Sequence, residues 1–341
     1  MDHDIKLEAA IRWNIRDSFA RLGSIKNDAI RAVFQDFNDN LFRVWSFATL
    51  LPKMMSLADR YGRAGERVAL QSSDAERSDP EFTKKSQEKI HAIVDAEEVE
   101  LEASKANGLA EDKRILQNIK FILGWYAQPT EDGTKNELLI AFDLMFQSIL
   151  INAWSAFEIF AEDLWIAAVD NDKSHKFAES YCTHSGGQSK SFTFEQLNKP
   201  EFRFDISNKL GSLLSKTEKV KFDSFSIIKS NYEGAFKTAP FSQRFQEVFN
   251  LSKADSANVL ALESVRNLLM HRGQKADNEF VDQIQKAKGC SLPSITGLVV
   301  GDTFTVDGEV VKVLVEAVVS LASSLTRLVD EALSPADGSA V

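Results

Sequence analysis

One stretch of the chain decides the fold class: ELLIAFDLMFQSILINAWSAFEIFAEDLWIAAVDN, residues 137–171. Its length suits a helix of roughly ten turns. Apolar residues cover most of the circumference of that helix, and a helix of this kind is buried between other helices. The stretch therefore predicts a helical bundle. Its few polar side chains include Asp143, Gln147, Asn152, Glu158, Glu162 and Asp163.

Amphipathic periodicity predicts further helices on both sides of this stretch. Apolar residues recur every three or four positions over residues 4–22, 25–60, 114–128, 257–271 and 314–333. Pro52 should kink or restart the second of these helices, because proline removes a backbone donor. Near the C-terminus, two runs rich in Val, Thr and Phe flank Asp307-Gly308, which predicts a β-hairpin over residues 298–313. We therefore expect an all-α protein: a helical bundle with a small β-hairpin insertion, preceded by a helical N-terminal region.

A chain of 341 residues is long enough for two domains. The segment PTEDGTKNE, residues 129–137, interrupts the helical pattern and predicts a boundary. Residues 1–130 then form a helical N-terminal region of unknown role, residues 135–333 form a helical domain, and residues 334–341 form a disordered tail. Within the first region, residues 63–113 are charged and poor in aromatic residues, which favours a solvated helix or linker over an interaction arm. Residues 172–204 are polar and are predicted to form a loop.

The composition limits the classes of function. The net charge of −10 opposes broad, non-specific coating of nucleic acid, but it leaves room for a local basic groove. Cys182 and Cys290 are far apart and predict no disulfide framework or zinc site. The N-terminus does not resemble a signal peptide, and charged residues interrupt the apolar stretches. We expect a cytoplasmic protein that has no membrane association, no metal and no cofactor.

The segment with the most chemical content is LESVRNLLMHRG, residues 262–273. It belongs to the expected helix over 257–271, with Asp255 or Ser256 as N-cap and Gly273 just after its C-terminus. At 100° per residue, one side of the helix is apolar and should pack inward. That side consists of Ala261, Leu262, Val265, Leu268 and Leu269. The opposite side carries Glu263, Arg266, Asn267, Met270 and His271.

The polar side of this helix has the residue types that cleave RNA without a metal. Asn267 and His271 are four residues apart and lie on one face. A histidine titrates near neutral pH and moves protons, and an arginine holds a phosphate with two parallel hydrogen bonds. In such a reaction the ribose 2′-OH attacks the phosphorus, the histidine moves the proton, and the arginine stabilises the phosphorane. The same residue types are also ordinary near the C-terminus of a helix, so a structural role stays open.

The segment RNLLMH resembles the motif of the HEPN superfamily, in which an Arg, often followed by a polar residue, precedes a His by four to six residues. The upstream WSAFEIFAEDL, residues 154–164, resembles the long helix that carries a buried acidic residue in that family. RGQKADNEFVDQI resembles the turn that follows the motif. The resemblance covers residues 135–333, where the order of the expected helices also agrees.

The resemblance implies an all-α bundle of four or five helices that forms a homodimer, with the motif helices facing each other. Many HEPN domains are metal-independent endoribonucleases that act as toxins or antiviral-defence effectors. Carried over by position, Arg266 contacts the scissile phosphate, His271 is the acid–base residue and Asn267 orients one of them. Glu158 is a supporting residue or, equally, a structural carboxylate. The implied partners are an RNA substrate, a second copy of the chain, and an antitoxin or regulatory protein. The alternative is a non-catalytic HEPN-like scaffold that mediates dimerisation or binds a protein partner.

Overall fold

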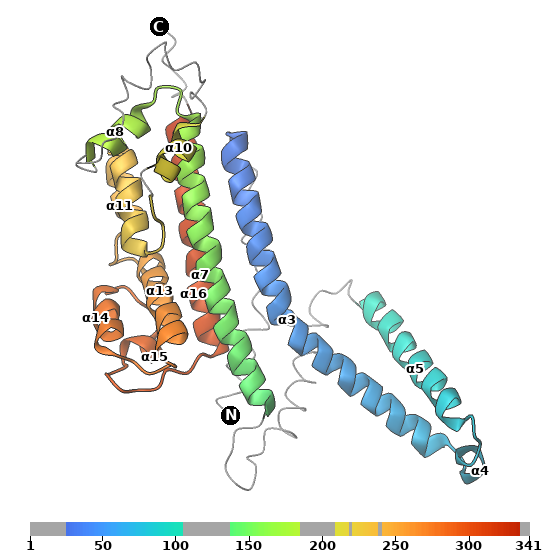
Figure 1. Cartoon of the computed structure of the whole chain (residues 1–341). Helices are drawn as coiled ribbons and strands as arrows, with labels where there is room; N and C mark the ends of the chain where they lie inside the picture. Colours follow the sequence, from blue (N-terminus) through green and yellow to red (C-terminus); the bar gives the residue numbers. More distant parts are fainter. Residues whose placement is uncertain (1–24, 105–136, 185–208, 218–219, 238–240, 335–341) are drawn as a thin grey trace. The chain divides into compact units, whose positions relative to one another are not determined.

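The computed structural model describes residues 25–104, 137–184, 209–217, 220–237 and 241–334. Within these ranges the regular secondary structure is helical (Figure 1), apart from one isolated β-bridge between Lys275 and Thr303. The prediction of an all-α protein is therefore confirmed for the described residues. The expected helices over 4–22 and 114–128, the expected boundary at 129–136 and the tail after residue 334 lie outside these ranges.

The chain divides into two compact units. Among the described residues, one unit contains residues 45–104, 137–146 and 307–309. The other, which we call the bundle, contains residues 25–44 together with most of the chain from residue 147 onward. Residues 25–44 therefore group with the C-terminal part of the chain, although the sequence predicts a boundary near residues 130–135.

Helix α3, Asp28–Gln71, belongs to both units. Its first part places Phe34 and Phe37 against Phe160 of α7, with ring centroids 6.3 and 4.6 Å apart. Asp330, near the end of α16, holds the start of α3, because its carboxylate accepts hydrogen bonds from the backbone N–H groups of Lys26 and Asn27. The helix continues past Pro52, so of the two forms predicted there, a kink or a restart, the restart is wrong. A proline removes only one bond of the backbone ladder, and the turns on both sides keep theirs.

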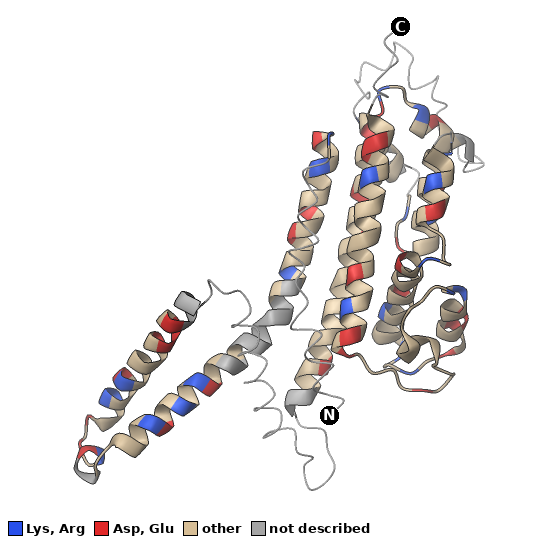
Figure 2. Ribbon diagram, turned by 180° about the vertical axis from the view of Figure 1, so that it is seen from behind, with Lys and Arg blue, Asp and Glu red and all other residues tan. Residues whose placement is uncertain are grey.

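Helix α7, Glu137–Asn171, confirms the long apolar helix that the sequence predicts. Within the bundle it buries Trp154, Phe157, Phe160 and Trp165 almost completely. Helix α16, Gly308–Leu333, lies beside it (Figures 1 and 2) and buries its apolar face. The buried residues of that face include Leu314, Val318, Leu321, Leu325, Leu328 and Val329. Residues Ile140–Asn171 are long and apolar enough to cross a membrane, a test that core helices of soluble proteins also pass, and half of the tested window is buried.

Helix α11, Phe225–Ala235, is fixed to α7 by two hydrogen bonds from buried side chains. The Tyr232 hydroxyl donates to the carbonyl of Ala161 at 2.9 Å, and the Trp165 indole donates to the carbonyl of Asn231 at 3.2 Å. Helices α8, Lys176–His184, and α12, Phe241–Val248, pack on α11. The short α10, Leu210–Thr217, lies between α8 and α11 in the chain. Helix α8 corrects the prediction that residues 172–204 are all loop, and residues 185–204 lie outside the described ranges.

The motif helix, α13, runs Ala254–His271 and confirms the predicted helix with a slightly earlier start. Its N-cap is Lys253, which makes no side-chain cap bond, so the prediction of Asp255 or Ser256 as N-cap is wrong. Gly273 follows the C-cap with φ of +55°, a conformation that glycine adopts without strain, as predicted for this position. Helix α14, Asn278–Lys286, then packs against α13, and the short α15, Pro293–Thr296, follows.

The expected hairpin over residues 298–313 does not form. Residues 308–313 are the start of α16, and Thr303 pairs with Lys275 in the β-bridge. The Asp307 carboxylate accepts the backbone N–H of Glu309 at 3.0 Å, which suits the start of a helix better than a two-residue turn. Val310, Val311 and Leu314 then continue the buried face of α16. Burial in the bundle therefore overrides the local β-propensity of the valines.

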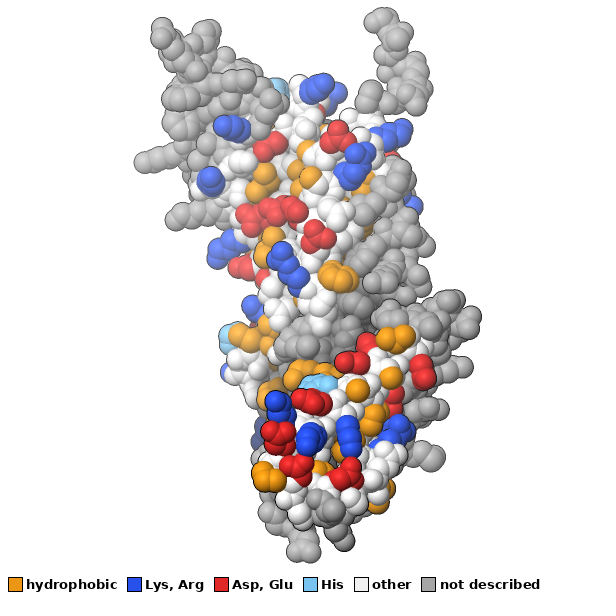
Figure 3. All heavy atoms as spheres, turned by 90° about the vertical axis from the view of Figure 1, so that its right-hand side faces the viewer, with side chains coloured by type: hydrophobic (Ala, Val, Ile, Leu, Met, Phe, Trp, Pro, Cys, Tyr) orange, Lys and Arg blue, Asp and Glu red, His pale blue; other side chains and the backbone are white. Residues whose placement is uncertain are grey.

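In the other unit, the second part of α3 and helix α5, Phe82–Ser104, form an antiparallel helical hairpin that is joined through the short α4, Asp74–Arg77. Ion pairs connect the two helices, at 2.5 Å between Arg60 and Glu98 and at 3.5 Å between Arg67 and Glu97. Both signs of charge are interspersed along the hairpin and across its visible face (Figures 2 and 3). The charged segment 63–113 is mainly helical over its described residues, 63–104. Of the two forms that its composition favours, a solvated helix or a linker, this agrees with the helix.

Candidate functional site

The motif residues lie on the outer side of α13 because its inner side is occupied by core residues. Ala261, Leu262, Val265 and Leu268 are buried, as the helical projection predicts, whereas Leu269, which it also places inward, is half-buried. The other side becomes more exposed toward the C-terminus: Glu263 and Arg266 are half-buried, whereas Asn267, Met270 and His271 are exposed. The helix thus presents the three motif residues, Arg266, Asn267 and His271, within its last two turns.

Arg266 and Asn267 are in direct contact. The Nη1 of Arg266 donates to the Oδ1 of Asn267 at 2.9 Å. The Nε of Arg266 is buried and has no hydrogen-bond partner among the described residues. A guanidinium has five N–H donors in a fixed fork, so this contact leaves most of them available to a ligand. In the described part of the chain, neither a hydrogen bond nor an ion pair connects Arg266 to His271.

Glu158 lies beside Arg266, although the two residues belong to different helices. Burial raises the pKa of Glu158 above the ordinary value of 4.5, while the indole N–H of Trp154 and the positive charge of Arg266 act to lower it. That indole N–H is buried close to the carboxylate and forms no regular hydrogen bond with a described residue. Among the described residues, Arg266 forms no ion pair within 4.0 Å. Glu158 therefore attracts the guanidinium without binding it directly.

Glu263 is a second carboxylate close to Arg266. Its Oε2 accepts the backbone N–H of Phe225, the first residue of α11, at 3.0 Å. Burial is the main cause that raises the pKa of Glu263, and the nearby charge of Glu158 raises it further. The hydrogen bond from Phe225 and the charge of Arg266 act in the opposite direction. Arg266 is thus close to two partly desolvated carboxylates.

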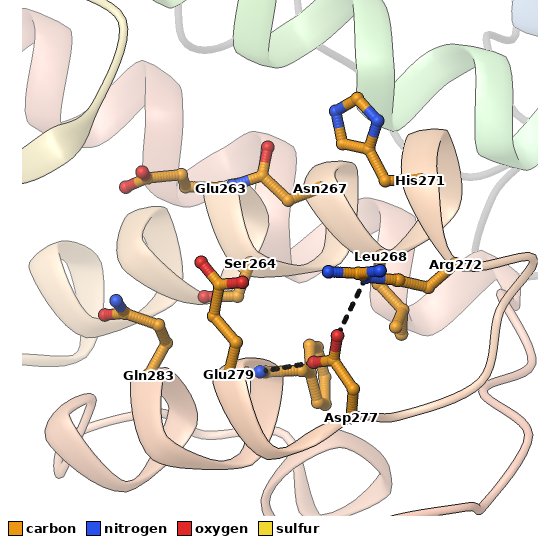
Figure 4. Close-up of a pocket in the computed structure, with 10 residues that line it drawn as sticks. Glu263, Ser264, Asn267, Leu268, His271, Arg272, Asp277, Glu279 and Gln283 are labelled. Carbon is orange, nitrogen blue, oxygen red and sulfur yellow. Dashed lines mark hydrogen bonds and ion pairs between the residues drawn. The ribbon is translucent and has the colours of Figure 1, made fainter.

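A groove of about 280 Å³ lies between α13 and α14, next to the motif (Figure 4). The buried side chains of Leu268 and Phe280 form its apolar floor. Asn267 lines the groove, and His271 stands at its rim with the imidazole ring pointing away from α14. Glu279 and Gln283 extend from α14 toward α13. Arg266 does not line this groove, and it lies close to Glu158 of α7.

The groove has an excess of negative charge. Arg272 forms an ion pair of 2.9 Å with Asp277, and Asp277 also accepts the backbone N–H of Phe280 (Figure 4). Because this pair is internally neutral, the charges that remain are the carboxylates of Glu263 and Glu279. Glu279 forms neither a hydrogen bond nor an ion pair with the residues that the structure describes. The groove therefore favours a ligand that donates hydrogen bonds over a phosphate.

The predicted site residues come together only in part. Arg266 and Asn267 are in contact, Glu158 is next to Arg266, and His271 shares the groove with Asn267. Sequence reasoning placed Glu263 on the outer side of the motif helix but did not select it as a site residue. The spacing could have indicated Glu263, because it is four residues before Asn267 and so lies on the same face of the helix. Glu279 and Gln283 gave no such signal, because only the packing of α14 on α13 brings them to the groove.

The described residues contain no group of three or more His, Cys, Asp or Glu side chains arranged to hold a metal ion. Comparisons of the chain with protein-family models, with curated proteins and with solved structures give no match.

Proposed function

We propose that this chain is a metal-independent endoribonuclease of the HEPN type that acts as a toxin or antiviral-defence effector, with its Arg/His site at a dimer interface. The observation that carries the proposal is the grouping around Arg266. Asn267 holds the guanidinium at 2.9 Å, Glu158 attracts it from α7, and His271 is exposed one turn after Asn267. These are the residues that the sequence motif selects, and they leave donors of Arg266 and the ring of His271 available to a ligand.

In the proposed reaction the RNA supplies its own nucleophile. The ribose 2′-oxygen bonds to the adjacent phosphorus while His271 removes the hydroxyl proton, and the P–O5′ bond breaks. Arg266 stabilises the extra negative charge of the phosphorane. The 5′-oxygen leaves as a hydroxyl after it takes up a proton from the His271 imidazolium, which restores the neutral ring. The products end in a 2′,3′-cyclic phosphate and a 5′-hydroxyl. DNA is not a substrate, since it lacks the attacking hydroxyl.

A dimer would bind phosphate more strongly at this site than a single copy. A single copy offers one Arg266 next to two carboxylates, in a chain of net charge −10, so its affinity for phosphates is small. A second copy placed across the motif helix would double the number of guanidinium and imidazole groups in one cleft. The exposed apolar side chains of Met270 and Ile159, 52% and 53% accessible, suit burial in such a contact.

A non-catalytic scaffold is the second candidate function. The carboxylates of Glu263 and Glu279 favour it, because they repel phosphate near the motif. The exposed Met270 and Ile159 serve a scaffold as well as they serve a dimeric nuclease. In this case Arg266 and His271 contribute to binding a protein partner and do no chemistry.

The deciding experiment uses the purified full chain and a labelled synthetic RNA in the presence of EDTA. We expect wild type to produce fragments with 2′,3′-cyclic phosphate ends, and His271→Ala to produce none while it melts at the same temperature. His91→Ala is the matched control, because it removes an exposed histidine of α5 in the other unit and should cut like wild type. Intact RNA with wild type, or equal cutting by His271→Ala, would contradict the nuclease and favour the scaffold.

A further inference from the structure

The groove beside the motif has features that a phosphate site does not need. It has an apolar floor made by Leu268 and Phe280, amide groups from Asn267 and Gln283, and two carboxylates that lack a cationic partner in the groove, Glu263 and Glu279. Its volume of about 280 Å³ is just below that of pockets for complete small ligands, which begin at roughly 300 Å³. A flat ring system with hydrogen-bond donors on its edge fits this combination of size, floor and charge.

We infer that this groove binds a guanine base of the RNA substrate and that Glu279 determines the specificity for that base. The inference rests on the proposed nuclease function. The phosphate next to that guanine would then lie beyond the rim at which His271 stands. Arg266, which donates to Asn267, would meet it there. A base in the groove and a phosphate at Arg266 are compatible, since Arg266 does not line the groove.

Guanine is selected by the pattern of donors on its Watson–Crick edge. N1–H and the exocyclic N2–H₂ are adjacent donors, and one carboxylate accepts both, as it does from the fork of an arginine. Adenine and cytosine each pair one amine donor with an acceptor, and uracil places its single N–H between two carbonyl oxygens. A carboxylate therefore repels part of the edge of these three bases. The guanine O6 can accept a hydrogen bond from the amide of Gln283 or Asn267.

Glu279 is better placed than Glu263 for this role. The Oε2 of Glu263 already accepts the backbone N–H of Phe225, and that side chain is partly buried. Glu279 is exposed and extends from α14 into the space below α13 (Figure 4). It makes no hydrogen bond or ion pair with a described residue that would compete with a ligand. Its position after the N-cap residue Asp277 is fixed, because Asp277 bonds to Phe280 and to Arg272.

The test measures binding, so that it does not depend on cleavage. The probes are fluorescent 2′-O-methyl oligonucleotides, which cannot be cut, with a single guanine or a single hypoxanthine in an otherwise uridine sequence. Hypoxanthine lacks only the exocyclic amine. We expect wild type to bind the guanine probe about tenfold more tightly, as a good bidentate contact to a base discriminates. Glu279→Gln should remove this difference, while Glu247→Gln, an exposed position on α12 that does not line the groove, should keep it.

The possible results separate the base site from the nuclease. Equal affinity of wild type for both probes, an unchanged preference in Glu279→Gln, or no binding of either probe would overturn the guanine site. An oligoarginine peptide that binds wild type but not Glu279→Gln, in the absence of a guanine preference, would also overturn it and assign the groove to cationic side chains of a protein. Cleavage without guanine preference would contradict the base site alone. Guanine preference without any cleavage of unmodified RNA would contradict the nuclease alone.

Discussion

The Arg266 guanidinium donates a hydrogen bond of 2.9 Å to the side-chain oxygen of Asn267, its neighbour in the chain. Consecutive residues on a helix do not normally face each other, so the contact bends the arginine side chain toward the face that carries Asn267 and His271. In the proposed nuclease, this contact would let Asn267 orient the cation that meets a phosphate.

Replacing Asn267 tests this role. Asn267→Ala should lower the rate of RNA cleavage by about tenfold, because the guanidinium loses its fixed orientation and roughly 1.4 kcal/mol corresponds to a factor of ten. The melting temperature should change little, since Asn267 is exposed. Asn267→Asp is the matched control, because its carboxylate still accepts from Arg266. Equal rates for wild type and Asn267→Ala would show that the contact is incidental.

The assignment of residues 25–44 to the bundle predicts a large effect of Phe37→Ala. The ring of Phe37 is 2% exposed and packs in a tilted contact against Phe160, with ring centroids 4.6 Å apart, so its removal should cost about 3–5 kcal/mol of unfolding free energy. Phe42→Ala, in the same helix at a position that is 43% exposed, should cost much less. Urea unfolding monitored by tryptophan fluorescence measures both. Similar effects of the two substitutions would mean that the start of α3 does not belong to the core.

Asp330 joins the end of α16 to the residues just before α3, and it should contribute more to stability than its exposed neighbour Glu331. Asp330→Ala leaves the backbone N–H groups of Lys26 and Asn27 without an acceptor and should cost about 1–3 kcal/mol. Glu331→Ala removes the same charge from an exposed ion pair with Arg244 and should cost at most about 1 kcal/mol. The comparison again uses urea unfolding, and the prediction fails if the Glu331 variant is the less stable one.

The carboxyl groups around Arg266 predict how stability depends on pH. The folded protein raises the pKa of Glu158 and of Glu263, mainly by burial, so it binds their protons more tightly than the unfolded chain does. Unfolding free energy should therefore increase as the pH falls from neutral toward 4.5, the ordinary value of these groups, and decrease as the pH rises through the folded pKa values.

Glu263→Gln isolates one of these contributions. The amide oxygen still accepts the N–H of Phe225, but the side chain no longer titrates. Between about pH 7 and about pH 4.5, the unfolding free energy of this variant should rise less steeply than that of wild type. Part of the slope remains, since burial also raises the pKa of Glu158, Asp163 and Glu316. An unchanged slope, matching that of the exposed control Glu247→Gln, would contradict the assignment.

The sequence by itself determined the class of the fold and the inner and outer sides of the main helices. Residues 137–171 and 254–271 are helical because their apolar residues repeat with the helical period, and this signal is local. The same reasoning selected Arg266, Asn267 and His271 as outward residues of one helix. It also predicted Gly273 at the end of that helix, where only the local backbone conformation matters.

Only the tertiary structure decided which other groups surround the motif. Local β-propensity suggested a hairpin at residues 298–313, whereas burial in the bundle made residues 308–313 helical. Glu158 reaches Arg266 from a helix that begins more than a hundred residues earlier in the chain, and Glu279 reaches the groove because α14 packs on α13. Side-chain periodicity indicates which face of a helix is buried but not which helix covers it. The charge around Arg266 and His271 therefore depends on contacts between helices, which the spacing of residues within one helix does not determine.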